Sequence, residues 1–176
     1  MRVLTADESR HWAKTHGIDL GSDGVPEREP ASLNMLRFGF PPTPPQLNWL
    51  ANFVAWSLKP RHSCLLWITA FGVFPSSENQ HLYYRLRQSY GDLRLLDEAP
   101  GHFFLEYEDA DLATFIEVGI LNGWDVHVLP ELAYGGPDTA RAFVCHDEWL
   151  ALFHRDPDTI AEWRHQLEKA QYQLFE

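Results

Sequence analysis

The sequence predicts a single α/β domain spanning residues 1–176, with a mixed sheet of about five to six strands, part parallel and part antiparallel, flanked by helices. The length fits one domain. Hydrophobic residues make up 45% of the chain and aromatic residues 14%, which indicates a packed, aromatic-rich core. Strand and helix patterns alternate through the middle of the chain, and strand patterns follow one another near its end. That order favours a sheet that is parallel in its middle and antiparallel at one side.

The N-terminal helix is predicted by its cap. Thr5 and Glu8 have the spacing of a capping box, so residues 6–16 are expected to be helical and to end at Gly17. The polar stretch 17–31 follows and is rich in glycine and proline. We expect it to be a mobile loop.

Three elements follow this loop. Residues 32–40 have the composition of a strand and run into a proline-rich turn. Pro44 suits a first helical turn because it lacks an N–H that would be unpaired there, and apolar residues recur at helical spacing over 44–58. Residues 63–74 form a continuous apolar run, as expected for a strand covered on both faces.

The next helix, predicted over 77–90, has clear signals at both ends. Ser77 and Gln80 match a capping box, and Gly91 suits the C-terminal stop. Much of the polar density at the start of this helix therefore has a structural explanation.

Three further elements lead up to the C-terminal third. Residues 102–107 predict a strand, and residues 108–121 predict a helix with acids in its first turn, where the helix dipole favours them. Residues 124–130 predict another strand because apolar and β-branched residues dominate there.

The last three elements are two strands and a helix. Residues 140–146 predict a strand, and residues 148–153 are interpreted as a short strand that forms a hairpin with it, in preference to a helix. Asp156 is placed to cap a helix that begins at Pro157.

The net charge is −11, and it is unevenly distributed. Residues 101–150 carry ten acidic side chains against one basic, Arg141, which is a net charge of −9. Such a surface repels nucleic acid and anionic lipid and attracts a basic protein partner. The alternative is a solvated face that only aids solubility. Of the acids in this segment, we expect three to contact a partner: Asp109, Asp111 and Glu117.

The N-terminus lacks the apolar run of a signal peptide, and no apolar stretch approaches the roughly 20 residues that span a bilayer. A cytoplasmic protein without membrane contact is expected. Cys64 and Cys145 lie in apolar runs and are interpreted as buried, unpaired thiols.

Two places could carry chemistry. One is the 76–81 loop at the end of a central strand, where open α/β sheets often bind ligands. Its catalytic candidates are Glu78 and His81, and its binding candidates are Asn79 and Tyr84.

The other place is the 146–148 cluster, with His146 as a further catalytic candidate. His127 and His146 lie on strands that could be neighbours, so these two with Asp147 are candidates for metal ligands. The sequence contains no signature of a nucleotide, zinc or serine-hydrolase site, and no cofactor is predicted.

Two classes of function follow. The favoured one is a non-catalytic protein that binds, and plausibly masks, a basic protein partner. Immunity proteins that neutralise nuclease toxins, and adaptor domains, fit this description by type, although no motif is shared. The alternative is an enzyme without a recognised motif, a hydrolase or transferase, that uses the 76–81 loop or the 146–148 cluster. The sequence leaves open whether the protein forms a homodimer.

Overall fold

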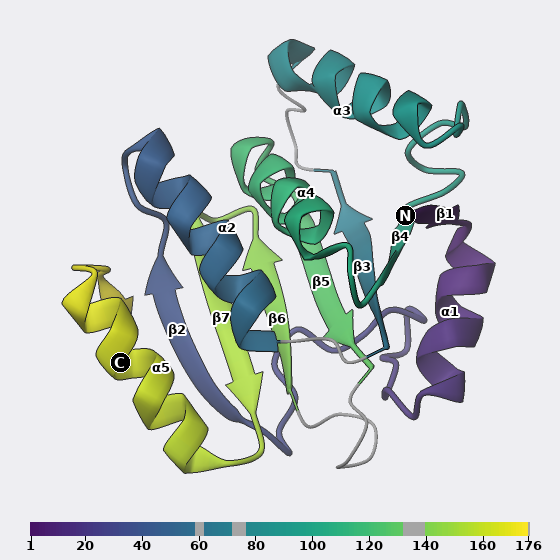
Figure 1. Ribbon diagram of the computed structural model, residues 1–176. Coiled ribbons are helices and arrows are strands. Elements are labelled where there is room, and N and C mark those ends of the chain that lie inside the picture. The colour runs from purple at the N-terminus through teal and green to yellow at the C-terminus, as the bar shows by residue number, and fades with distance from the viewer. Residues whose placement is uncertain (59–61, 72–76, 132–139, 176) are drawn as a thin grey trace.

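The computed structural model describes residues 1–58, 62–71, 77–131 and 140–175, and for 77–80 only the path of the backbone. In these ranges the chain forms five helices and one sheet of eight strands, with strand order β1-β4-β3-β5-β6-β7-β2-β8 (Figure 1). In chain order the elements are β1 (Arg2–Leu4), α1 (Ala6–Thr15), β2 (Asn34–Gly39), α2 (Pro44–Leu58), β3 (Ser63–Ala70), α3 (Ser77–Ser89), β4 (Gly101–Leu105), α4 (Asp109–Leu121), β5 (Asp125–Pro130), β6 (Ala140–Cys145), β7 (Trp149–His154), α5 (Pro157–Lys169) and β8 (Leu174–Phe175).

All neighbouring strands in the described ranges are antiparallel, so the prediction of a part-parallel sheet of five to six strands is wrong. The alternation of strands and helices was misleading for a specific reason. Helix α4 does connect two strands that run in the same direction, β4 and β5, but β3 lies between them in the sheet. Likewise α5 connects β7 to β8, and β2 lies between those strands. Strands β1 and β8 were not predicted, because a strand of two or three residues is too short to show the alternation of apolar and polar residues.

Helix α3 connects its strands differently. Strands β3 and β4 are direct neighbours and antiparallel, so the connection between them returns from the same end of the sheet. Figure 1 shows α3 lying across that end instead of along a face. A helix in this position does not produce the parallel pair that a crossover helix would.

Helices α2, α4 and α5 cover one face of the sheet, where the largest part of the core lies (Figure 1). Leu66 of β3, Val128 of β5 and Leu152 of β7 point into this layer and are completely buried. Because side chains alternate along a strand, the residues between them face the other side of the sheet. The helices thus bury most of the strand side chains on this face.

The other face is covered in part by α1 and by the stretch after it. Ala13 of α1 and Ile18 pack on Leu65, Trp67 and Leu129 of the sheet. A separate apolar group continues across β6 and β7, with Phe143, Cys145, Trp149, Ala151 and Phe153 as its strand residues. This second face also carries most of the buried polar side chains considered below.

Several local predictions are confirmed. Thr5 and Glu8 form the expected capping box at the start of α1. Gly91 adopts a φ of 80° just after α3, a conformation that glycine adopts without strain. The segment predicted as a strand over 148–153 corresponds to β7, which begins at Trp149 and pairs with β6. Both cysteines are free and buried, as expected.

Among the described helices, none combines the length and the apolar composition that crossing a membrane requires.

Candidate functional site

Two groups of side chains have functional potential. The first, here called the Asp125 cluster, consists of Asp125, Cys145 and His146. The second, here called the acidic groove, is a surface depression of about 660 Å³ between the helices. Its lining residues are Trp49, Asn52, Phe53, Ala55, Trp56, Asp109, Ala110 and Gln166.

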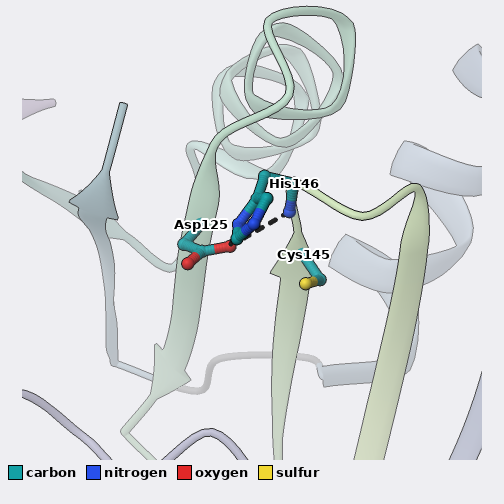
Figure 2. Close-up of side chains that lie close together, drawn as sticks. All are labelled: Asp125, Cys145 and His146. Atoms are coloured by element: carbon teal, nitrogen blue, oxygen red, sulfur yellow. Dashed lines mark hydrogen bonds and ion pairs between the residues drawn. The ribbon is translucent and has the colours of Figure 1, made fainter. Parts of the chain in front are cut away.

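The sheet register brings the Asp125 cluster together. Val126 of β5 pairs with Val144 of β6, so the first residue of β5 lies opposite the last residue of β6. The turn that follows β6 then places His146 over the start of β5. Figure 2 shows the imidazole of His146 beside the carboxylate of Asp125, with the thiol of Cys145 below them.

The carboxylate of Asp125 is completely buried and has three partners. Its Oδ1 accepts hydrogen bonds from the backbone N–H of His146 at 3.0 Å and from the ring Nδ1 at 2.8 Å (Figure 2). Its Oδ2 accepts a hydrogen bond from the guanidinium of Arg28 at 2.7 Å. A buried charge is tolerated only where it is paired in this way. Asp125 therefore ties the turn after β6 and the 17–31 stretch to the start of β5.

Asp147 lies on the other side of the cluster. One carboxylate oxygen is 3.4 Å from Nε2 of His146, and the other is 3.8 Å from Sγ of Cys145. Burial raises the pKa of the Cys145 thiol to about 11. At neutral pH this thiol is protonated and is not an activated nucleophile.

His127 lies two residues after Asp125 and therefore on the same face of the sheet. Its ring centroid is 4.7 Å from that of Phe143. Burial, together with Arg141 and Arg28, lowers the pKa of His127 to about 3, so its imidazole is neutral. His127, Asp125 and Arg28 line a pocket of about 450 Å³ beneath the 17–31 stretch.

The prediction that His127 and His146 occupy neighbouring strands is confirmed in part. His127 lies within β5, whereas His146 follows β6 directly. The close partners of His146 are Asp125 and Asp147. The proposed set of His127, His146 and Asp147 thus stays a prediction, while the residues that lie closest together are those of the Asp125 cluster.

The 76–81 loop yields less information. The side chains of Glu78 and Asn79 lie outside the described residues. His81 is exposed on α3, and Tyr84 is partly buried with its ring edge-on to Tyr83 at 5.9 Å. The strand before this loop ends at Ala70, which pairs with Asp125. The stretch between Phe71 and α3 lies outside the described residues, and residues 77–81 form the first turn of α3.

The acidic groove crosses α2 and reaches the start of α4. Trp49 and Trp56 are seven residues apart and so lie on one side of α2. Their exposed fractions are 40% and 50%, large values for tryptophan. The ring of Trp49 is held in place by stacking on Phe53 at 5.1 Å and on Tyr172 at 5.2 Å.

The three predicted contact acids are all on α4 but do not share one surface. Asp109 lines the groove, and partial burial together with Glu106 raises its pKa. Glu117 accepts a hydrogen bond from Asn48 of α2 at 3.0 Å. Asp111 lies two residues from Asp109 and thus on another side of the helix, beside Tyr90.

Other acids of residues 101–150 are engaged within the fold. Glu108 pairs with the N-terminal amine of Met1, and Glu131 accepts a hydrogen bond from Ser63 at 2.5 Å. Asp125 is buried, and Asp138 lies outside the described residues. The charge that the sequence concentrates in one segment is thus divided among several places, and only part of it borders the groove.

Sequence reasoning missed Arg28 and Asp125. One signal was present: Asp125 is a lone acid at the start of a strand of otherwise apolar and neutral residues. An acid in such a strand is buried and needs a partner. The partner could not be identified, because Arg28 lies 97 residues away in a loop.

The antiparallel open sheet of the described residues, with a layer of helices on one face, defines the chain as an α/β open-sheet protein. No protein-family model, no curated protein and no solved structure matches it.

Proposed function

We propose that this chain is a non-catalytic protein-binding domain whose acidic groove receives a basic segment of another protein. The role is that of a masking protein of the immunity type or of an adaptor. The observation that supports the proposal best is the juxtaposition of two exposed tryptophans, Trp49 and Trp56, with the carboxylate of Asp109 in one depression.

The aromatic part of the groove suits an interface. Tryptophan dominates binding hot spots because it buries a large area and loses little conformational freedom. The ring of Trp49 is already fixed by its two stacking contacts, so its contact with a partner would cost little conformational entropy. An indole face also attracts the guanidinium of arginine or the ammonium of lysine. The groove therefore favours a partner with a cationic side chain at its centre.

Asp109 is the one charged residue among the described residues that line the groove, and its negative charge favours a cationic partner. Asp109 and Glu106 are both exposed, and they are close enough for Glu106 to raise the pKa of Asp109. A cation placed beside these carboxylates relieves their mutual repulsion. Such complementarity raises the association rate, and salt weakens it because the charges are exposed. The same charge disfavours nucleic acid and anionic membrane surfaces as partners.

We also propose that the protein acts in the cytoplasm. Its two cysteines are free thiols, and free thiols persist in a reducing compartment.

Fluorescence anisotropy with a labelled oligo-arginine peptide tests the groove. We expect the wild type to bind the peptide at about 0.01 M ionic strength and to lose at least tenfold in affinity at about 0.15 M. Trp56→Ala and Asp109→Lys should each weaken binding by about tenfold or more. Glu168→Lys is the matched control, because it makes the same charge change at an exposed position of α5.

The result that contradicts the proposal is equal binding at both ionic strengths, or equal loss in Glu168→Lys and Asp109→Lys. A peptide of the same length with glutamate in place of arginine should not bind at either ionic strength.

A hydrolase or transferase that uses the 146–148 cluster is the second candidate. The observation in its favour is the bond between Asp125 and His146, since a carboxylate that orients an imidazole is what a general base needs. A screen of chromogenic carboxylic and phosphoric esters, with wild type and His146→Ala compared, tests it. Hydrolysis that the substitution does not reduce would eliminate His146 as the base.

A further inference from the structure

We propose that the Asp125 cluster is a binding site for a transition-metal ion of the Zn²⁺ type, with Asp125, Cys145 and His146 as its protein ligands. One ligand atom from each of these residues lies within 4.8 Å of the others. The three come from the ends of two adjacent strands and the turn after one of them, so the sheet itself holds them in place. The site lies on the opposite face of the sheet from the acidic groove and is independent of the proposed binding function, but it shares His146 and Asp125 with the second candidate function.

The distances between the ligand atoms are near those of a tetrahedral zinc site, so a bound ion would require only a small adjustment. Zinc bonds of about 2.0–2.3 Å in tetrahedral geometry place ligand atoms roughly 3.3–3.8 Å apart. The observed separation between Oδ1 of Asp125 and Nδ1 of His146 is 2.8 Å. An ion would replace the proton that now joins these two atoms. The carboxylate and the imidazole would separate by about half an ångström, and the thiol would approach them.

The types of donor select the ion. A thiolate with an imidazole and one carboxylate matches zinc and its neighbours, whereas Mg²⁺ and Ca²⁺ prefer oxygen donors. Coordination converts the Cys145 thiol to a thiolate, and its proton passes to solvent. His146 binds as a neutral imidazole through Nδ1, and the proton that the ion displaces from Nδ1 passes to Nε2 or, where Nε2 already carries a proton, to solvent.

The surroundings supply the outer contacts that metal sites require. The Nε2–H of a bound His146 would face the carboxylate of Asp147, now 3.4 Å away, which is the carboxylate–histidine–metal arrangement of many zinc sites. Arg28 and the backbone N–H of His146 already orient the carboxylate of Asp125. Each proposed ligand except the thiol thus has an outer partner that fixes its direction.

Three protein ligands leave the fourth tetrahedral position open. In structural zinc sites the protein fills all four positions, whereas an open position takes water, a substrate or a ligand from another molecule. Asp125 lines the pocket of about 450 Å³ that also contains His127 and Thr69. Of the three proposed ligands, Asp125 is the one that lines this pocket, so its carboxylate would connect the ion to a space with room for a small molecule.

A purely structural role for Asp125 competes with this proposal. In that alternative, the carboxylate serves only to bind Arg28 and His146, and Cys145 is an apolar filler next to Phe143 and Trp149. The two accounts differ in one respect. Only the metal-site proposal predicts that the thiol of Cys145 and the imidazole of His146 bind the same ion.

Cobalt titration of the full chain, after treatment with a chelator, tests the site. We expect one equivalent of Co²⁺ to produce a thiolate-to-metal charge-transfer band and the absorption of a tetrahedral centre, and Zn²⁺ to abolish both. Cys145→Ser should remove the charge-transfer band. His146→Gln should weaken binding more than a hundredfold, since even the loss of an outer partner costs about 10- to 100-fold.

Two matched controls accompany these variants. Cys64→Ala removes the other buried cysteine, and His165→Gln removes an exposed histidine of α5. Both should retain the band and the affinity of the wild type, and circular dichroism checks that every variant folds. Absence of the band in the wild type overturns the proposal. So does cobalt binding that survives in both Cys145→Ser and His146→Gln at wild-type affinity.

Discussion

Asp125 and Asp109 belong to the same acid-rich segment, yet their surroundings are opposite. Asp125 is completely buried and receives hydrogen bonds from Arg28 and His146. Asp109 is exposed at the start of α4, beside a second acid, Glu106. One carboxylate holds three parts of the chain together. The other, Asp109, lines the acidic groove and lies close to a like charge, Glu106.

The contrast shows how a chain of net charge −11 can use its acids in two ways. A buried charge contributes to the fold only through its partners, and the loss of one partner is costly. An exposed acid contributes little to stability, and what it can offer is an electrostatic field for a partner. The position of an acid in the sequence does not show which of the two uses it has, but the burial of its carboxylate does.

Among the changes at the two acids and in the groove, the largest expected effect concerns the buried carboxylate. Asp125→Ala removes the acceptor of Arg28 and leaves the N–H of His146 without its partner, so the free energy of unfolding should fall by about 2–4 kcal/mol. Urea denaturation followed by circular dichroism measures it. Asp109→Ala, the matched change on the exposed acid, should alter stability by about 0.5 kcal/mol or less. Equal losses in the two variants would remove the distinction between them.

The next effect is a pH dependence of stability that arises near the same cluster. The pKa of His127 is about 3 in the folded protein against an ordinary value of 6.5, because the imidazole is buried. The folded state therefore binds fewer protons than the unfolded state between these values. Stability from this group is complete above pH 6.5 and is lost as the pH falls toward 3, by about 1 kcal/mol per pH unit.

Substitution isolates this contribution from that of His102, which has a similarly lowered pKa. His127→Gln should reduce the slope of stability against pH between 6 and 4 by about 1 kcal/mol per unit. Urea denaturation at a series of pH values gives the slope. An unchanged slope in His127→Gln would mean that this imidazole is protonated equally in both states.

A smaller effect is expected on association. Reversal of Asp109, Asp111 and Glu117 together should slow the association of an oligo-arginine peptide by about tenfold at low salt. Stopped-flow anisotropy measures the rate. Since Asp111 lies on another side of α4, the pair Asp109→Lys and Glu117→Lys should account for most of the change. Dominance of Asp111→Lys would move the binding surface toward α3.

The smallest expected effect is on the stability of the protein when a tryptophan of the groove is replaced. Trp56 is half exposed, so Trp56→Ala should lower the free energy of unfolding by no more than about 1 kcal/mol. Thermal denaturation provides the measurement. The comparison variant is Trp163→Ala, at a buried position of α5. Its free energy of unfolding should fall by about 3–5 kcal/mol. A large loss in Trp56→Ala would give this tryptophan a structural role instead.

Much of the local structure could be predicted from the sequence, because caps and periodicity are local signals. Thr5 with Glu8, and the apolar spacing after Pro44, located the ends of their helices closely. The order of the strands could not be predicted. It depends on which strand lies between the two that a helix connects, and the alternating pattern is the same whether β3 lies between β4 and β5 or not.

The candidate sites were predictable only in part. His146 and Asp109 were identified from their neighbours in the sequence, and each lies in one of the two candidate sites. The carboxylate that orients His146 was not identified, because that pairing depends on the register of β5 and β6. The exposure of Trp49 and Trp56 was hidden as well, since the sequence pattern assigns both to a wide apolar face of their helix.

Binding of a cationic segment in the acidic groove can be observed through the indole N–H signals of a ¹⁵N-labelled sample. The seven tryptophans give one signal each, assigned by single substitutions to phenylalanine. On titration with an oligo-arginine peptide at low salt, the signals of Trp49 and Trp56 should shift. The signals of the buried Trp67, Trp124 and Trp163 should stay in place. Shifts confined to tryptophans outside the groove, or no shifts at saturating peptide, would contradict the account.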